Sequence, residues 1–211
     1  NKFKGSASAI TDMALLPGGK YLISANQDGS LKLWNTIDGH QEKVYRGHLK
    51  GKTSVAVFST GRKVISGGRE GLIIIWDLLR GIKINSYKIT REPIRCISIS
   101  PDDLRMLVGT ENGDLLMVNT NTGKVLWKIK EEESINSVTF SPDGKSVLCT
   151  SAAKPFSLRD AYTGSVIQKY QGHFYGVHAA SFVPDGRMII SSGGDQTVKA
   201  WDVTTGQLLM T

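Results

Sequence analysis

Cysteine is scarce in this sequence, and its placement excludes several classes of protein. The two cysteines, Cys96 and Cys149, stand in separate apolar stretches with no Cys-x-x-Cys or Cys/His spacing. That pattern argues against a disulfide or zinc framework and is typical of reduced, buried thiols. We therefore expect no metal site and a cytoplasmic or nuclear localisation.

Long hydrophobic runs are also missing. The longest, Leu72 to Trp76, suits a buried strand and falls far short of the roughly 18 to 20 residues that a membrane helix needs. The sequence opens without a methionine or an apolar signal core, so we expect the start to be a cut point. With 40% hydrophobic and 21% charged residues, a soluble globular protein is expected.

Helical periodicity is absent, and short strand-like runs recur instead. Runs of four to six residues rich in Val, Ile, Leu and Phe, such as 55–58, are too short and too β-branched for helices. They are separated by turn residues, of which Pro142-Asp143-Gly144 and Pro184-Asp185-Gly186 are examples. The chain is therefore expected to be all-β.

The sequence repeats itself about every 42 residues. Marker positions at the ends of similar apolar runs are Trp34, Trp76, Val118, Arg159 and Trp201. Four short antiparallel strands in such a period are typical of a propeller blade. The period excludes leucine-rich, ankyrin and tetratricopeptide arrays.

These repeats resemble the WD-repeat family over essentially the whole chain. The resemblance implies a β-propeller of four-stranded antiparallel blades, with five WD-type repeats in one segment spanning residues 1–211. The repeats run over about 5–46, 47–88, 89–129, 130–171 and 172–211. Since family propellers most often have about seven blades, we expect this array to be part of a larger propeller, with the missing blades supplied by the rest of a longer chain or by a partner.

The family's blades are stapled by a buried network of His, Ser or Thr, Asp and Trp. The acid orients the imidazole, the hydroxyl bridges, and the indole N–H finds an acceptor. The resemblance assigns this structural network to His173, Ser191, Asp195 and Trp201 in repeat five; His48, Ser66, Glu70 and Trp76 in repeat two; and Ser24, Asp28 and Trp34 in repeat one, where Ser6 replaces the histidine.

Repeats three and four depart from the staple. Their corresponding residues are Thr90, Val108, Asn112 and Val118, then Glu131, Cys149, Ala153 and Arg159. We expect the stability of these two repeats to come mainly from apolar packing.

Partners of this family are usually held on the top face of the propeller, formed by residues just after the Gly-His position and just before the network acid. Arginine and tyrosine there combine contact area with directional hydrogen bonds. The resemblance points to Arg69, Arg95, Glu111, Asn136, Tyr175 and His178 as partner-binding residues. It implies a non-catalytic scaffold that docks proteins or peptides within a multiprotein complex, with no cofactor.

Two other functions are alternatives to a protein-interaction scaffold. The net charge of +7 allows weak, salt-sensitive contact with nucleic acid, as in a ribonucleoprotein or chromatin assembly, but no aromatic stacking row or arginine-rich tract is present. The segment 118–127 resembles the tryptophan-docking motif of quinoprotein dehydrogenases, yet only Trp127 occupies the recurring tryptophan position. No nucleophile or carboxylate is tied to His178 by a recognisable motif, which argues against an enzyme.

Overall fold

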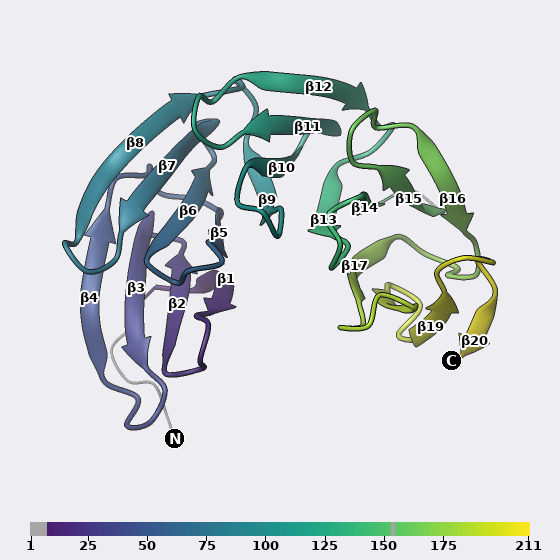
Figure 1. The fold of residues 1–211 in the computed structure, drawn as a ribbon, viewed down its shortest axis with the longest axis horizontal. Helices are drawn as coiled ribbons and strands as arrows, with labels where there is room; N and C mark the ends of the chain where they lie inside the picture. The colour runs from purple at the N-terminus through teal and green to yellow at the C-terminus, as the bar shows by residue number, and fades with distance from the viewer. Residues whose placement is uncertain (1–7, 153–154) are drawn as a thin grey trace. The chain divides into compact units, whose positions relative to one another are not determined.

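The computed structural model describes residues 8–152 and 155–211 and confirms the all-β prediction. Within these residues the chain forms five four-stranded antiparallel sheets, each a meander of consecutive strands (Figure 1). The strands of the first three sheets are β1 (Ile10–Leu15), β2 (Tyr21–Asn26), β3 (Ser30–Asn35) and β4 (Gln41–Arg46); β5 (Thr53–Val57), β6 (Lys63–Gly68), β7 (Leu72–Asp77) and β8 (Ile82–Lys88); β9 (Ile94–Ile99), β10 (Arg105–Thr110), β11 (Asp114–Asn119) and β12 (Val125–Lys130). Those of the last two are β13 (Ile135–Phe140), β14 (Ser146–Ser151), β15 (Phe156–Asp160) and β16 (Val166–Tyr170); β17 (Val177–Phe182), β18 (Met188–Gly193), β19 (Val198–Asp202) and β20 (Leu208–Met210).

The chain divides into two compact units, residues 1–97 and 98–211, and each is described by itself. The first unit contains the first two sheets complete. The second contains the last two sheets complete, together with β10 to β12 of the third sheet.

The turn between the third and fourth strands has the same chemistry in several sheets. In the fourth sheet, Asp160 Oδ1 accepts hydrogen bonds from the amides of Tyr162 at 2.9 Å and Thr163 at 2.8 Å. Gly164 closes this turn with φ of +75°, a conformation that glycine adopts without strain. The hydrogen bonds from the Thr163 amide, the Tyr162 amide and the Thr163 hydroxyl hold the pKa of Asp160 below its ordinary value. A short polar sequence thus reverses the chain without burying an unpaired backbone group.

The core of the first unit lies between its first two sheets. One face of β2 and β3 supplies Ile23, Ala25, Leu31 and Leu33, all of which are buried. Apolar side chains of the second sheet pack against them, namely Val55, Val64, Ile74, Trp76 and Leu78. Because side chains alternate along a strand, each of these sheets presents a continuous apolar face to its neighbour.

The core of the second unit shows the same packing between the fourth and fifth sheets. Leu148 of β14 and Phe156 of β15 are each 1% exposed beneath the fifth sheet. The corresponding residues of the fifth sheet, Ile190 and Val198, are 47% and 60% exposed. The outer face of the fifth sheet is therefore an apolar face of the kind that a neighbouring sheet covers elsewhere in this unit.

Candidate partner-binding site

The fifth sheet holds the complete polar staple assigned from the sequence. Ser191 Oγ accepts a hydrogen bond from Trp201 Nε1 at 2.8 Å and contacts His173 Nε2 at 2.8 Å. His173 Nδ1 lies 2.9 Å from Asp195 Oδ1, and the backbone amide of Phe174 donates to Asp195 Oδ2 at 3.0 Å. The staple thereby fixes the start of the loop that follows His173.

The carboxylate of Asp195 is held in its charged form. Desolvation by itself would raise its pKa, but hydrogen bonds from Thr197, His173 and the Phe174 amide outweigh this and lower the pKa well below its usual range. A depressed folded-state pKa means that the folded protein resists protonation at Asp195 while the unfolded chain accepts the proton near pH 4.

Acidification should therefore destabilise the wild-type chain partly through Asp195. Its contribution is complete above about pH 5 and is lost as the pH falls through 4 towards the folded-state pKa. We expect Asp195→Asn to lose stability at pH 7 but to show a smaller further drop in midpoint temperature between pH 5 and pH 3 than the wild type. Thermal unfolding followed by circular dichroism measures the midpoint temperature at each pH. If the midpoint temperatures of the two proteins fall equally between pH 5 and pH 3, the role given to Asp195 is wrong.

The first two sheets hold versions of the same staple. In the second sheet, Ser66 Oγ joins Trp76 Nε1 at 2.8 Å to His48 Nε2 at 2.7 Å, and His48 Nδ1 pairs with Glu70. In the first sheet, Trp34 Nε1 donates to Ser24 Oγ at 2.9 Å. Asp28 there accepts from the Ser30 hydroxyl at 2.6 Å, while Ser6 lies outside the described residues.

In the fourth sheet an ion pair takes the place of the staple, and the sequence analysis did not predict it. Arg159 stands at the tryptophan position and Glu131 at the histidine position, and their side chains form an ion pair. Arg159 also donates to Ser157 Oγ at 3.1 Å and to the Gly164 carbonyl at 3.0 Å. The expectation that apolar packing mainly stabilises repeat four stays a prediction, to which the structure adds a guanidinium and its acceptors at the place of the staple.

The third sheet also carries a polar substitute. Asp114 at the start of β11 pairs with Lys128 at 2.8 Å and Lys130 at 3.4 Å on the neighbouring β12. Burial would raise the pKa of Asp114, but these two ammonium groups and a hydrogen-bonding contact with Asn112 lower it. Thr110 Oγ1 also hydrogen-bonds to Asn112. Apolar packing in this sheet is thus accompanied by charge pairing that the sequence reading did not identify.

The top loops of the first unit border an open hollow of about 480 Å³. These loops include the β2–β3 turn, and we call the hollow the top pocket. Its lining is formed by Ser8, Ala9, Gln27, Asp28, Lys50, Gly51 and Arg69. Arg69 is exposed, and its Nη1 donates to the Lys50 carbonyl at 3.4 Å. The guanidinium is therefore tethered at the mouth of the pocket while most of it faces solvent.

Arg95 is placed differently from Arg69. It is half-buried on β9 and does not line the top pocket. Of these two predicted partner-binding arginines, Arg69 lines the top pocket and Arg95 does not.

The top loop before β17 in the second unit presents aromatic side chains. Tyr175 is 66% exposed, and Phe174, which the sequence reading did not select, is 75% exposed. A Cβ atom at Gly194 would lie 3.1 Å from Tyr175 Cβ and 3.6 Å from His178 Nε2, so these two side chains flank Gly194. We call Phe174, Tyr175 and His178 the aromatic patch. Phe174 could have been found from its place directly after the fixed His173.

Asn136, Thr11 and Asp12 make hydrogen bonds between neighbouring sheets. Asn136 Nδ2 donates to the Val177 carbonyl of the fifth sheet at 3.0 Å, which ties β13 to β17. In the first unit, Thr11 Oγ1 likewise donates to the Thr53 carbonyl at 2.6 Å, and Asp12 accepts from Ser54 Oγ at 2.6 Å. Asn136 is therefore a contact between sheets, whereas Glu111 is exposed.

Trp127 contacts the neighbouring sheet, as the quinoprotein hypothesis predicts for a tryptophan at this position. Its indole N–H donates to the Ala161 carbonyl of the next sheet at 3.2 Å, and it lies against Gly164. At the positions that correspond to Trp127, the first and fifth sheets have Lys43 and Met210, which pair with Leu33 and Ala200 as Trp127 pairs with Met117. The contact is therefore local to one pair of sheets.

Two further features are absent from residues 8–152 and 155–211. No cluster of three His, Cys, Asp or Glu side chains has an arrangement that would hold a metal ion. No helix of sufficient length and apolar character to cross a membrane is present in the same part of the chain.

Comparison with known proteins agrees with the sheet architecture. The model of the WD40 family, described as WD domain, G-beta repeat, matches residues 1–35, 39–77, 123–153 and 164–202. The unmatched stretch 78–122 contains β9 to β11, in which Val118 replaces the marker tryptophan.

Individual relatives are distant. The chain is 29% identical over 194 residues to WD repeat-containing protein SL1-17 of Schistosoma mansoni, which is 90% of this chain and 64% of that protein. It is 28% identical over 121 residues to WD repeat and SOCS box-containing protein 1 of Xenopus tropicalis, covering 52% of this chain and 28% of that protein. With U3 small nucleolar RNA-associated protein 21 of Saccharomyces cerevisiae it shares 26% identity over 126 residues, 60% of this chain and 13% of that protein.

The chain thus spans less than two thirds of the length of each of these relatives. The repeat period, the four-stranded sheets, the Ser-Trp staples and the family match agree with one another. This chain belongs to the WD40-repeat family.

Proposed function

We propose that the chain is a non-catalytic scaffold that docks partner proteins or peptides through its top loops. The proposal rests on one contrast: the staple holds the backbone of the loop in place, while the side chains that follow it face solvent. His173, bound on both ring nitrogens, is directly followed by Phe174 and Tyr175, whose side chains face solvent. Such preorganised aromatic side chains contribute large contact areas at little cost in conformational entropy.

The top pocket supports the same proposal in the first unit. Lys50 and Arg69 at its mouth suit a carboxylate on a partner, since a guanidinium binds carboxylates with two directed hydrogen bonds. Each unit thus offers its own contact group, cationic in the first and aromatic in the second. A WD40 domain commonly binds proteins, and we infer that these groups determine which partner this chain takes.

Two cysteines set in separate apolar stretches, with no Cys-x-x-Cys spacing, are typical of a reducing compartment. Cys96 is half-buried on β9, and Cys149 is buried in β14. We therefore retain the cytoplasm or nucleus as the proposed location, and a larger propeller within a multiprotein complex as the proposed context. The exposed apolar face of Ile190 and Val198 suits another sheet from such a propeller.

Affinity capture with matched surface variants tests the proposed top-loop function. Partners bound by the wild-type chain should be retained after nuclease treatment and at raised salt. The Arg69→Glu variant and the double variant Phe174→Ala, Tyr175→Ala should each recover at least about tenfold less of them, because losing one central contact costs more than about 1 kcal/mol. Quantitative mass spectrometry measures the recovery.

Lys83→Glu on the outer strand β8 is the control for the charge reversal, and it should bind as the wild type does. If both top-loop variants also bind normally, the proposal is wrong. Binding that disappears with nuclease or falls steeply with salt would instead show contact through nucleic acid.

A further inference from the structure

A second cavity in the first unit lies at the other end of the sheets from the top pocket. It is formed beside the β1–β2 turn and the turns of the adjacent sheet, with a volume of about 320 Å³, and we call it the corner pocket. Its wall is apolar and includes Leu16, Leu33 and Leu78, each less than a tenth exposed. The half-buried ring of Tyr21 completes this wall. It is a built hollow between two sheets that the top-loop function does not use.

The rim of the corner pocket is mainly basic. Lys43 and Arg62 line the rim and are exposed, with Glu42 the one acidic residue of the lining. Lys43 Nζ is held by the carbonyls of Leu78 and Leu79, and Lys20 Nζ lies 5.4 Å from the centre of the Tyr21 ring. Leu79, at 76% exposure, extends the apolar surface outward.

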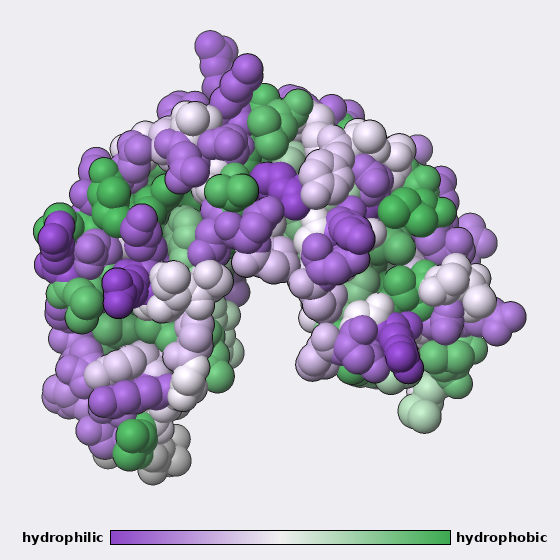
Figure 2. Space-filling view, viewed as in Figure 1, coloured by the Kyte–Doolittle hydropathy of each residue, from purple (hydrophilic) through white to green (hydrophobic). Residues whose placement is uncertain are grey.

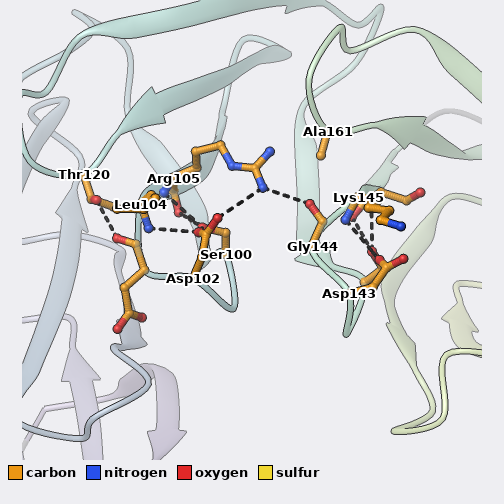
Figure 3. A network of polar contacts seen from close by, with 12 residues as sticks. Ser100, Asp102, Leu104, Arg105, Thr120, Asp143, Gly144, Lys145 and Ala161 are labelled. Carbon is orange, nitrogen blue, oxygen red and sulfur yellow. Dashed lines mark hydrogen bonds and ion pairs between the residues drawn. The ribbon is translucent and has the colours of Figure 1, made fainter.

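The corresponding corners in the second unit are built differently. Arg105 occupies the position of Tyr21 at the start of its strand, opposite Asn119 as Tyr21 is opposite Asn35. Its guanidinium reaches across to the next sheet and donates to the Gly144 carbonyl at 3.0 Å (Figure 3). It also lies 4.5 Å from the centre of the Tyr162 ring. In this corner an arginine of the chain itself fills the space that is open beside Tyr21.

The corner between the fourth and fifth sheets has acidic rather than basic residues in its lining. Its cavity is lined by Pro142, Phe182 and Val203 together with Ser141, Asp143, Ser146 and Asp185. Asp143 is kept charged by the hydrogen bond from Ser141 and the amide of Lys145, which lower its pKa. Of these three corners, only the one in the first unit combines an apolar wall with a cationic rim.

The distribution of charge along the sequence matches this difference. Residues 1–97 contain sixteen Lys and Arg against seven Asp and Glu, a net charge of +9. Residues 98–211 contain ten against twelve, a net charge of −2. The whole positive excess of the chain therefore belongs to the unit that carries the corner pocket, where it would attract an acidic partner at long range.

We propose that the corner pocket binds an acidic, amphipathic peptide segment of a partner protein, with one large aliphatic or aromatic side chain inserted against Leu16, Leu33 and Leu78. Acidic residues on either side of the inserted group pair with Lys43 and Arg62. A protein segment fits better than a nucleic acid, because the wall is aliphatic and burying it requires an apolar side chain. This site is separate from the top loops and does not depend on their function.

Selection of peptides tests the proposal without a known partner. Random twelve-residue peptides displayed on phage are selected on the immobilised chain at physiological salt. We expect the enriched peptides to contain Leu, Ile, Met or Phe beside at least two Asp or Glu residues. Recovery of no enriched peptide, or of peptides without acidic residues, would overturn the proposal.

Variants then locate the binding site. Tyr21→Arg copies the plug that Arg105 forms and also adds positive charge. It should lower the affinity for the selected peptides by about tenfold if a peptide side chain inserts into the cavity. It should raise that affinity if only the charge of the surface matters. Arg62→Glu should lower the affinity to a similar degree, and so should Leu79→Ser at an exposed position that leaves the core intact.

Matched controls separate this site from others. Arg187 holds the place of Arg62 in the fifth sheet, following Gly186 as Arg62 follows Gly61, and Arg187→Glu should not change peptide affinity. Arg69→Glu should not change it either, so failure of the top-loop function and failure of this site give different results. If a single-stranded oligonucleotide displaces the peptides and still binds to Tyr21→Arg, the basic surface serves nucleic acid and the proposal is wrong.

Discussion

Replacing Trp201 with alanine should lower the free energy of unfolding by about 3 to 5 kcal/mol, the usual cost of removing a fully buried indole. Trp201 is 1% exposed, its ring meets those of Phe156 and Tyr170 edge-on at 5.6 and 5.8 Å, and its N–H satisfies Ser191. The side chain thus connects the core between the fourth and fifth sheets to the polar staple. Urea unfolding followed by circular dichroism measures the change.

Two further variants separate the contributions of the indole. Trp201→Phe keeps most of the apolar ring and removes the N–H bond to Ser191, so we expect a loss nearer to 1 to 2 kcal/mol, roughly the net value of a buried hydrogen bond plus some lost volume. Trp127→Ala is the control, since Trp127 is only half-buried and should cost less than Trp201→Ala. Equal losses at the two tryptophans would contradict the role assigned to the staple.

Arg159→Leu should destabilise the chain by about 2 to 4 kcal/mol, because removing one partner of a buried ion pair leaves the other charge without compensation. The side chains of Arg159 and Glu131 are 10% and 23% exposed, which places the expected cost towards the lower part of the range for buried pairs. Ser157 and the Gly164 carbonyl also lose their donors. Urea unfolding gives the change directly.

The double variant Glu131→Leu, Arg159→Leu makes the test specific to the ion pair. Replacing both charges with apolar groups removes the uncompensated carboxylate, so most of the lost stability should return. Arg187→Leu at an exposed position should stay within about 0.5 kcal/mol of the wild type. If the double variant is as unstable as the single one, the pair does not act as the staple of this sheet.

These staples matter for binding because they determine which loop residues are fixed and which remain available. In the fifth sheet the staple holds the amide of Phe174, while the side chains of Phe174 and Tyr175 face solvent. Further exposed apolar residues lie on β20 of the same sheet, where Leu208, Leu209 and Met210 are 45%, 51% and 70% exposed (Figure 2). The aromatic patch and this strand belong to different parts of the sheet.

Much of the architecture followed from local pattern. A period of about 42 residues, β-branched runs and turns of Pro, Asp and Gly predicted the all-β fold, since strand propensity and turn chemistry act over a few residues. The staple residues of repeats one, two and five were also readable, because their spacing within one repeat is fixed by the register of neighbouring strands. Trp201 and Ser191, for example, lie on the paired strands β19 and β18.

The ion pairs that replace the staple in repeats three and four were not predicted, although the sequence contains their residues. Glu131 and Arg159 are separated by the same 28 residues as His173 and Trp201, which is a signal that an ion pair had replaced the imidazole and the indole. Whether such charges meet depends on side-chain geometry within a buried site, and sequence spacing alone does not show it. The same holds for Asp114 and the two lysines of β12.

What the sequence by itself determined is the repeat, its strands and the intact staples, because those depend on interactions within one repeat. Contacts between repeats were decided only by the tertiary structure. Asn136 is held by the Val177 carbonyl of the next sheet, Arg105 fills a corner that stays open beside Tyr21, and Arg69 lines the top pocket whereas Arg95 does not. The physical reason is that each of these outcomes depends on which backbone or apolar group of the adjacent sheet lies opposite, and a repeat's own pattern does not specify its neighbour.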